Sequence, residues 1–241
     1  MFRYAPELVE RFPSVVGGVV HAQGLGNGPS PSALRDAFAA EQQLARDRIG
    51  GRPLSELPSV AAWRRVFRDF GVDPTAYRSA AEALLRRLTK QGSIPSIGTL
   101  VDVGNLVSIR HALPVAVFDR RRLTGAVTVR FATGGEPFTD LGSGERESCP
   151  AGEVIFIDDG GLVCARRWCW RQGSESASGP ETAEVMVTVE GHDERARESV
   201  AAAVADLEAL LAAHAGPTAL ASAVLDGGRS EFGGIPAVDP A

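Results

Sequence analysis

The chain has 241 residues, of which 44% are hydrophobic, and this is enough to form one sizeable buried core. Its net charge is -5, so the chain as a whole lacks the basic character of proteins that coat long nucleic-acid duplexes. The opening MFRYAPELVERF carries charges throughout, and no apolar run approaches the ~20 residues that span a bilayer, so neither a secretion signal nor a membrane partner is expected.

The first half of the chain is predicted to be one strand followed by helices. VVGGVVHAQGL (15–25) is predicted as a strand because β-branched valines dominate and the glycines disfavour a helix. Each helix that follows has apolar residues at helical spacing. The predicted helices cover about 33–49 after a cap at Ser32, 60–70 after a cap at Ser59, 74–89, and the stretch from about 99 that ends before Pro114.

Short β-rich segments dominate the chain after Pro114. They are VAVFD, GAVTVRFA, EPFTDLG, EVIFIDD, GLVCARRWCW and AEVMVTVEG. The Asp-Gly between EVIFI and GLVCARRWCW predicts a hairpin. A helix is expected from about 193 to 213, and the last ~25 residues are expected to be loop-like.

The order of these elements predicts an α+β fold rather than a regular βαβ alternation. We expect a single domain over 1–241. Its core covers about 94–215, a helical portion covers about 30–90, and a C-terminal tail covers about 216–241.

The segment CARRWCWR (164–171) holds three arginines, two of the three tryptophans and two of the three cysteines. If it is a strand, Arg166, Trp168 and Trp170 share one face, and Arg167 and Arg171 share the other. One interpretation is a two-faced strand with packed tryptophans and solvated arginines. The other is a binding platform, because Arg grips phosphate and Trp stacks on bases.

The same segment gives little support for a metal or a disulfide. Cys164 and Cys169 would face opposite sides of a strand, no C-x-x-C is present, and the four histidines are scattered. No phosphate-binding loop or nucleophile elbow occurs, so we expect no metal and no cofactor. An odd number of cysteines suits a reducing compartment, which predicts a cytoplasmic protein.

The helix VDVGNLVSIRH carries a polar stripe in an otherwise apolar sequence. Asp102, Asn105 and Ser108 follow one another at i, i+3 and therefore lie near one face, and His111 follows at the helix exit. Such a stripe could be a solvated face or could bind a polar ligand, and periodicity alone does not decide between them.

Several sequence segments, taken in their order along the chain, resemble those of a known family. From Ile94 to about Gly191, the succession LVDVGNLVS, LPVAVFD, GAVTVRFATGGEPFTDLGSGERE, GEVIFIDDGGLVCARRW and ETAEVMVTVEG resembles the B3/B4 domain of the bacterial phenylalanyl-tRNA synthetase beta subunit. Free-standing proteins of this type resemble the chain from about 15 to 211, including VAAWRRVFRDFGVDPTAYRSAAEALLRRL. The resemblance implies a layered α+β sandwich and an editing site that hydrolyses tyrosine wrongly attached to the phenylalanine tRNA.

The resemblance carries over to individual positions with two departures. Asn105 corresponds to the Asn of the synthetase helix. Two residues after Pro114, where the synthetase pattern has a functional His, this chain has Ala116. The synthetase Glu that recognises the tyrosine hydroxyl corresponds to Thr188, or to Glu190 if the register shifts by two residues. These departures leave the amino-acid specificity open.

The implied function is a tRNA-binding protein that hydrolyses mischarged aminoacyl-tRNA in trans, with an aromatic or related amino acid as its target. Aminoacyl ester hydrolysis needs a positioned water and stabilisation of an oxyanion. The predicted site residues are Asn105 and His111 as catalytic groups, Asp102, Ser108 and Thr188 around the aminoacyl group, Arg166 and Arg171 on phosphates of the acceptor end, and Trp168 and Trp170 stacked on its terminal base. Two alternatives stay open: a non-catalytic binder of tRNA or of an aminoacyl-like small molecule, and an enzyme acting on another amino-acid ester.

Overall fold

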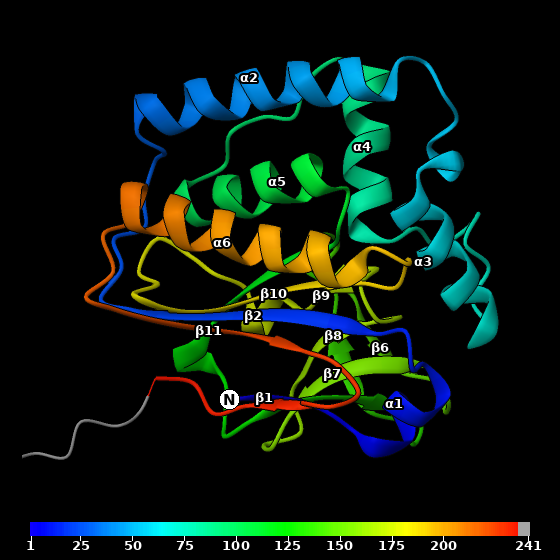
Figure 1. Ribbon diagram of the computed structural model, residues 1–241. Helices are drawn as coiled ribbons and strands as arrows, with labels where there is room; N and C mark the ends of the chain where they lie inside the picture. The colour runs from blue at the N-terminus through cyan, green and yellow to red at the C-terminus, as the bar shows by residue number, and fades with distance from the viewer. Residues whose placement is uncertain (236–241) are drawn as a thin grey trace, which may run out of the picture.

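The computed structural model describes residues 1–235 as a layer of helices lying on two stacked β-sheets (Figure 1). The helices are α1 (Pro6–Arg11), α2 (Ser32–Ile49), α3 (Pro58–Asp69), α4 (Ala80–Gln91), α5 (Thr99–His111) and α6 (Ala196–His214). The described chain also has three 3₁₀ turns: η1 (Leu54–Glu56) between α2 and α3, and η2 (Arg120–Arg122) and η3 (Ser174–Ser176) between strands. Within residues 1–235 no helix combines the length and the apolarity needed to cross a membrane.

The two sheets differ in their pairing. The first sheet is antiparallel and has the order β11 (Ala219–Leu225), β2 (Val16–Gln23), β10 (Glu184–Gly191), β3 (Val115–Asp119). The second is mixed, because β1 runs parallel to β4, and its order is β12 (Glu231–Phe232), β1 (Phe2–Tyr4), β4 (Val127–Phe131), β7 (Val154–Asp158), β8 (Val163–Arg166), β9 (Arg171–Gln172). A separate ribbon pairs β5 (Pro137–Thr139) with β6 (Arg146–Ser148). The expected α+β class is confirmed.

Strand β10 separates the two main hydrophobic cores of the molecule. Its residues alternate between the faces of the sheet, so Val185, Val187 and Val189 pack against the helical layer that includes α5 and α6. Met186 joins the core between the two sheets, and Thr188 and Glu190 share its face. Two polar side chains therefore point into the apolar layer between the sheets.

Several predicted elements are confirmed, whereas three helix starts are wrong. The predicted strand, the helices near 33–49, 60–70, 99–113 and 193–213, and the hairpin of β7 with β8 are all present. Ser32 and Ser59 lie inside their helices and not at the caps, since Pro31 and Leu57 precede the first turns. Helix α4 begins at Ala80 and not near Pro74, because Asp73 closes a turn on Thr75 and Ser79 Oγ accepts the cap bond from the Glu82 amide at 3.3 Å.

The two ends of the described chain are more ordered than the sequence predicts. Strand β1 and helix α1 were not expected, and residues 219–225 form a strand where a loop was predicted. Strand β11 pairs with β2 along its whole length, and β12 pairs with β1. The end of the predicted tail, 236–241, lies outside the described residues.

Candidate functional site

A small cavity of about 80 Å³ lies between the two sheets, beside the edge strand β3. Strands β3, β7, β8 and β10, the chain around β9, and the first residue of α4 form its walls. The lining residues are Ala80, Pro114, Val115, Ala116, Phe156, Ala165, Trp168, Cys169, Trp170, Arg171, Gln172, Thr188 and Glu190. The cavity thus combines apolar walls with a few polar groups, which is the usual character of a small-ligand site.

The positions at which the sequence departs from the synthetase pattern meet in this cavity. Ala116 pairs with Thr188 across β3 and β10, and both residues line the cavity. Glu190 follows two positions later on the same face of β10 and lines it as well. Thr188 and Glu190, the two alternative counterparts of the synthetase Glu that recognises the tyrosine hydroxyl, therefore line the same cavity.

Glu190 is a buried carboxyl with two donors on one oxygen. Its Oε1 accepts a hydrogen bond from the Tyr4 hydroxyl at 2.7 Å and another from the Trp168 indole N–H at 3.0 Å. Burial raises the pKa of Glu190 from 4.5 to about 7, although both hydrogen bonds favour its charged form. The carboxyl is therefore close to half ionised near neutral pH, which suits proton transfer.

A glycine on the neighbouring strand makes room for this contact. Gly17 pairs with Glu190 in the first sheet, and a Cβ built at Gly17 would lie 2.0 Å from the Tyr4 hydroxyl oxygen. Only a residue without a side chain lets Tyr4 come this close. From the sequence, Gly17 indicated only that this segment is not a helix, and no neighbouring residue indicated that Tyr4 would contact it.

The segment CARRWCWR is not a continuous strand, so the predicted division of its side chains between two faces is wrong. Strand β8 ends at Arg166, and the next two residues, Arg167 and Trp168, have left-handed φ values of 43° and 59°. Their amides are held by long-range partners. The Arg167 amide donates to Glu153 Oε1 at 2.9 Å, and the Trp168 amide donates to the Val154 carbonyl at 2.7 Å. Non-glycine residues in this conformation are strained and often lie at functional sites.

Trp168 is fully buried in an aromatic cluster at the back of the cavity. Its ring centroid lies 5.3 Å from that of Trp63 on α3, 4.9 Å from His192 and 5.2 Å from Phe12, all in edge-to-face geometry. This packing and the bond to Glu190 fix the indole. The helical portion before residue 90 therefore contributes to the wall of the site, and Trp168 offers no free face for a nucleotide base.

Trp170 lies on the outer side of the cavity and is covered by cations. The Arg167 guanidinium carbon lies 4.5 Å from its ring centroid, and that of Arg171 lies 5.1 Å away. Tyr77 packs edge-on against the same ring at 5.0 Å and lies beneath Arg167 at 3.9 Å. Cation–π contacts of this kind leave a mixed aromatic and basic surface at the edge of the site.

Arg166 is almost fully buried, and its donors are engaged by carboxylates. Its Nε and Nη2 donate to the two oxygens of Glu153 at 2.9 and 3.0 Å, and Nη1 contacts Glu147. Burial lowers the pKa of Arg166, but the hydrogen bonds and charge of Glu153 outweigh this and raise it. A phosphate would have to displace these partners, whereas Arg171 is largely exposed and lies 3.7 Å from Asp140.

The polar residues of α5 do not line the cavity, because α5 covers the opposite face of the first sheet. Asp102 is buried and accepts bonds from Ser30 Oγ at 2.6 Å and the Ile97 amide at 2.9 Å, so it fixes the entry to the helix. Ser108 Oγ donates to the Leu113 carbonyl at 2.7 Å. His111 Nε2 lies 2.7 Å from Asp206 Oδ2. Asn105 is half-buried on the same helix.

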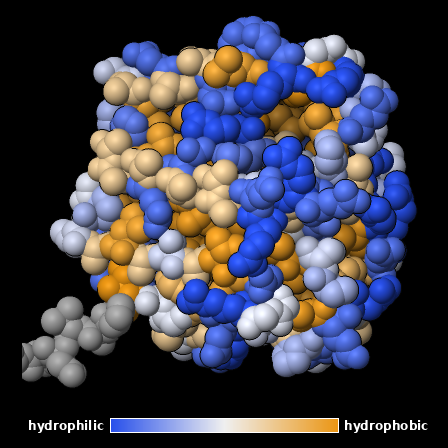
Figure 2. Space-filling view, viewed as in Figure 1, coloured by the Kyte–Doolittle hydropathy of each residue, from blue (hydrophilic) through white to orange (hydrophobic). Residues whose placement is uncertain are grey.

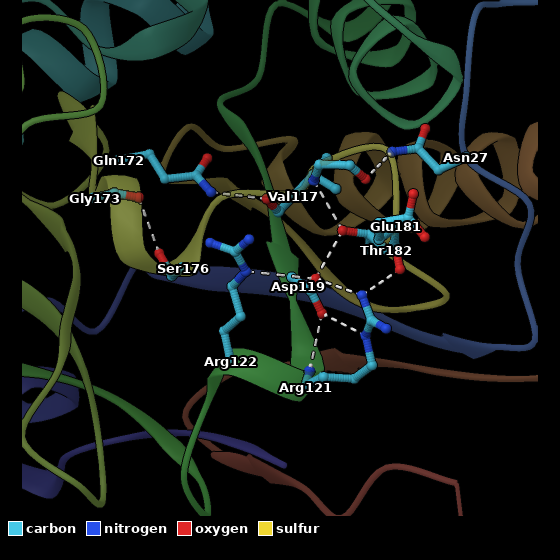
Figure 3. Close-up of polar contacts among 11 residues, drawn as sticks. Asn27, Val117, Asp119, Arg121, Arg122, Gln172, Gly173, Ser176, Glu181 and Thr182 are labelled. Atoms are coloured by element: carbon cyan, nitrogen blue, oxygen red, sulfur yellow. Dashed lines mark hydrogen bonds and ion pairs between the residues drawn. The ribbon is translucent and has the colours of Figure 1, made fainter.

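Gln172 connects the two sheets beside the cavity. Its side-chain amide donates to the Val117 carbonyl on β3 at 2.8 Å (Figure 3). Two residues further along β3, Asp119 accepts bonds from Arg121 and from the Thr182 hydroxyl at 2.8 Å (Figure 3). The Gln172 bond ties the edge strand to β9, and the Asp119 bonds tie the end of that strand to the chain that follows it and to the loop before β10.

The chain is similar in sequence to part of known phenylalanine–tRNA ligase beta subunits. The phenylalanine–tRNA ligase beta subunit of Streptomyces avermitilis is 32% identical over 135 residues, 56% of this chain and 14% of the relative. That of Nocardia farcinica is 38% identical over 125 residues, 52% of this chain and 14% of the relative. A crystal structure of an N-terminal fragment of the phenylalanyl-tRNA synthetase beta subunit from Pyrococcus horikoshii aligns with a TM-score of 0.44 and 14% identity, over 88% of this chain and 48% of the fragment.

The chain spans about one seventh of the length of these curated relatives. The similarity therefore concerns one portion of a synthetase subunit. The family model described as the B3/4 domain matches residues 62–206, which is more than half of the chain. The chain belongs to the B3/4 domain family.

Proposed function

We propose that this protein binds the acceptor end of aminoacyl-tRNA and hydrolyses the ester of mischarged tRNA in trans. One observation carries the proposal. The positions that correspond to the synthetase recognition residues, 116 and 188 or 190, line one cavity together with a buried carboxyl whose pKa is about 7. We further propose that the protein works in the cytoplasm, where tRNA is charged.

The reaction adds water to the ester carbonyl carbon, breaks the bond from that carbon to the ribose oxygen, and leaves a free amino acid and tRNA. In the proposed mechanism, ionised Glu190 accepts the proton of the attacking water and then, as the protonated acid, gives that proton to the ribose oxygen as it leaves. The Thr188 hydroxyl lines the same cavity and would donate to the oxyanion that forms on the carbonyl. Because Ala116 replaces the synthetase-type His, the proton acceptor would come from β10 and not from β3.

The size of the cavity favours a small amino-acid side chain. Its volume of about 80 Å³ is roughly half of the ~150 Å³ that holds benzene in an engineered protein cavity. A tyrosine ring would enter only after Trp170 or Arg171 moved outward. Both lie at the outer edge, where such movement costs least. The proposed order of hydrolysis is therefore small side chains first and aromatic ones second.

The test uses tRNAs charged with small, branched and aromatic amino acids, and it measures the rate at which each amino acid is released. Wild-type protein should hydrolyse at least one of them, and Glu190→Gln should lower that rate at least tenfold. Glu184→Gln is the matched control, because it makes the same change on the same strand outside the cavity. Hydrolysis by Glu190→Gln at the wild-type rate would exclude Glu190 as the proton acceptor.

A second function is favoured by the alanine at position 116. Without an imidazole at that position, the cavity could bind an aminoacyl group without cleaving it. In that case wild-type protein would release none of the amino acids and would still bind aminoacyl-tRNA more tightly than uncharged tRNA.

A further inference from the structure

The helical portion before residue 90 carries a local excess of positive charge in an acidic protein. Residues 46–90 contain ten arginines and lysines and five acidic residues, whereas the chain as a whole has a net charge of -5. Most of the basic residues lie on α3, on α4 and on the turns beside them. Figure 2 shows hydrophilic side chains covering much of the side of the molecule where α3 lies.

Two surface hollows lie along α4, and basic side chains form much of their walls. The first has a volume of about 740 Å³ and extends from α4 towards Arg46 and Arg52. The second, about 490 Å³, extends from α4 towards the CARRWCWR segment. Arg78, Arg86 and Lys90 line both hollows, so the two adjoin each other along α4, and together they are here called the α4 groove.

Little within the described chain neutralises this groove. Glu82 is the acidic residue in its wall, and it is paired with Arg64 at 2.7 Å and with Arg78 at 3.8 Å. Arg86 and Lys90 are exposed and form no ion pair with residues 1–235. They also lie four residues apart on one helix, where like charges repel each other. The fold therefore gains nothing from these two charges, which leaves them available to an anionic ligand.

The α4 groove ends beside the cavity between the sheets. Trp170 and Arg171 line both the second hollow and the cavity, so these two side chains form the wall between them. Along α4, Ala80 at the cavity and Lys90 are ten positions apart, which corresponds to roughly 15 Å at ~1.5 Å rise per residue. That distance equals about four stacked nucleotides at ~3.4 Å each.

We propose that the α4 groove binds the phosphates of the single-stranded acceptor end of tRNA, with Arg86 and Lys90 as phosphate ligands and with the Trp170 ring, against which Arg167 and Arg171 lie, as the mixed aromatic and basic end of the groove. This inference rests on the proposed function, because it names the surface that would hold the tRNA end while the aminoacyl ester lies at the cavity. An aromatic ring beside a basic track is the usual arrangement for single-stranded nucleic acid. An anionic lipid surface fits less well, because the described exposed large apolar side chains, Met1, Leu44, Ile97 and Leu141, lie outside the groove.

The experiment measures the affinity of the wild-type protein for uncharged tRNA, and for the same tRNA without its single-stranded 3′ nucleotides, between about 50 and 200 mM salt. The groove variant is Arg86→Glu with Lys90→Glu. The control variant is Arg195→Glu with Arg229→Glu, which makes the same change of net charge at exposed positions away from the groove. Arg86→Ala with Lys90→Ala repeats the test without introduced acidic groups, and thermal melting of each variant checks that it is folded.

The groove variant should lose at least tenfold in affinity, and the slope of log affinity against log salt should fall by about 1.4, or ~0.7 for each phosphate contact on a single strand. The control should bind within about twofold of wild type. Removal of the 3′ nucleotides should weaken wild-type binding and leave the groove variant almost unchanged. Equal losses in both variants, or an intact affinity in the groove variant, would overturn the inference.

Two further measurements separate this inference from others. Binding of wild-type protein to phosphatidylserine-containing vesicles, lost in the groove variant while tRNA binding persists, would assign the groove to a membrane surface instead. Hydrolysis of a small aminoacyl ester without RNA should be equal in the wild type and the groove variant. Absence of that hydrolysis together with groove-dependent tRNA binding would overturn the proposed function and leave this inference standing.

Discussion

The buried carboxyl of Glu190 should make the stability of the protein depend on pH, and Glu190→Gln should remove that dependence. Glutamine has nearly the same shape as glutamate and keeps an oxygen that accepts the bonds from Tyr4 and Trp168. It cannot ionise. The substitution therefore resembles a permanently protonated Glu190 and changes little else in the cavity.

The magnitude follows from the difference in pKa between the two states. Burial raises the pKa of Glu190 from 4.5 to about 7 in the folded protein, and each unit corresponds to about 1.4 kcal/mol. Because the folded-state pKa is the higher one, the stabilising contribution is complete below about pH 4.5 and is lost as the pH rises through about 7. From about pH 5 to pH 8, wild type should lose about 2 to 3 kcal/mol relative to Glu190→Gln.

The assay is denaturant unfolding, or thermal melting, of both proteins at several values between about pH 5 and pH 8. The variant should be the more stable protein at about pH 8, by roughly 5 to 10 °C in Tm for a chain of this size. Glu184→Gln is a control of opposite sign. Hydrogen bonds from His21 and Gln23 hold the pKa of Glu184 below its usual value, against the effect of its burial, so that variant should gain nothing at high pH. A stability difference between Glu190→Gln and wild type that stays constant over this range would refute the reasoning.

Three further substitutions test the packing and the limits of the site. Gly17→Ala should cost about 1 to 3 kcal/mol of unfolding free energy, because the new methyl group collides with Tyr4, and denaturant unfolding would measure this. Arg166→Ala should cost about 3 to 5 kcal/mol in the same assay, since it leaves buried Glu153 with only the longer ion pair to Arg167 at 3.7 Å, and a loss below ~1 kcal/mol would contradict that role. Asn105→Ala should leave ester hydrolysis within about twofold of wild type, because Asn105 lies across the first sheet from the cavity, and a tenfold loss in a deacylation assay would instead support its sequence-based role as a catalytic residue.

Periodicity along the chain was sufficient to locate the main helices and most of the central strands. The helix over 99–111 and strand β10 depend on the order of their own apolar residues, so a single sequence contains the signal for them. Strands β1 and β12 are too short for such a signal, and they exist because each pairs with a partner far away in the sequence. The left-handed turn at Arg167 and Trp168 likewise depends on Glu153 and Val154, which no local pattern identifies.

The residues predicted for the site do not all meet in one place in the folded chain, for a physical reason. Asp102 and Ser108 on α5 looked like ligand-binding groups because they are polar residues in helical register. In the folded chain, hydrogen bonds close to them in space satisfy both. In the comparison with the synthetase sequence pattern, Glu190 was one of two possible counterparts of the recognition Glu, and Thr188 was the other. Its importance emerges only when Tyr4, from the first strand, and Trp168, from a distant turn, meet at its carboxyl.

The contacts of Glu190 are relevant to function because a buried ionisable side chain lowers the stability of the folded protein. An apolar residue at position 190 would complete the core between the sheets without the cost of an ionisable group whose charged form is disfavoured by burial. The fold instead supplies an indole and a phenol as donors to this carboxyl, keeps a glycine opposite it, and holds two residues in left-handed geometry beside it. Several destabilising features around one cavity are expected where a titratable group takes part in catalysis or binding. The α4 groove shows the same conflict at the surface, since Arg86 and Lys90 repel each other and gain no ion pair from residues 1–235 in return. Trp170 and Arg171 line both places, so the proposed ligand, with an anionic backbone and an ester at its end, would contact both.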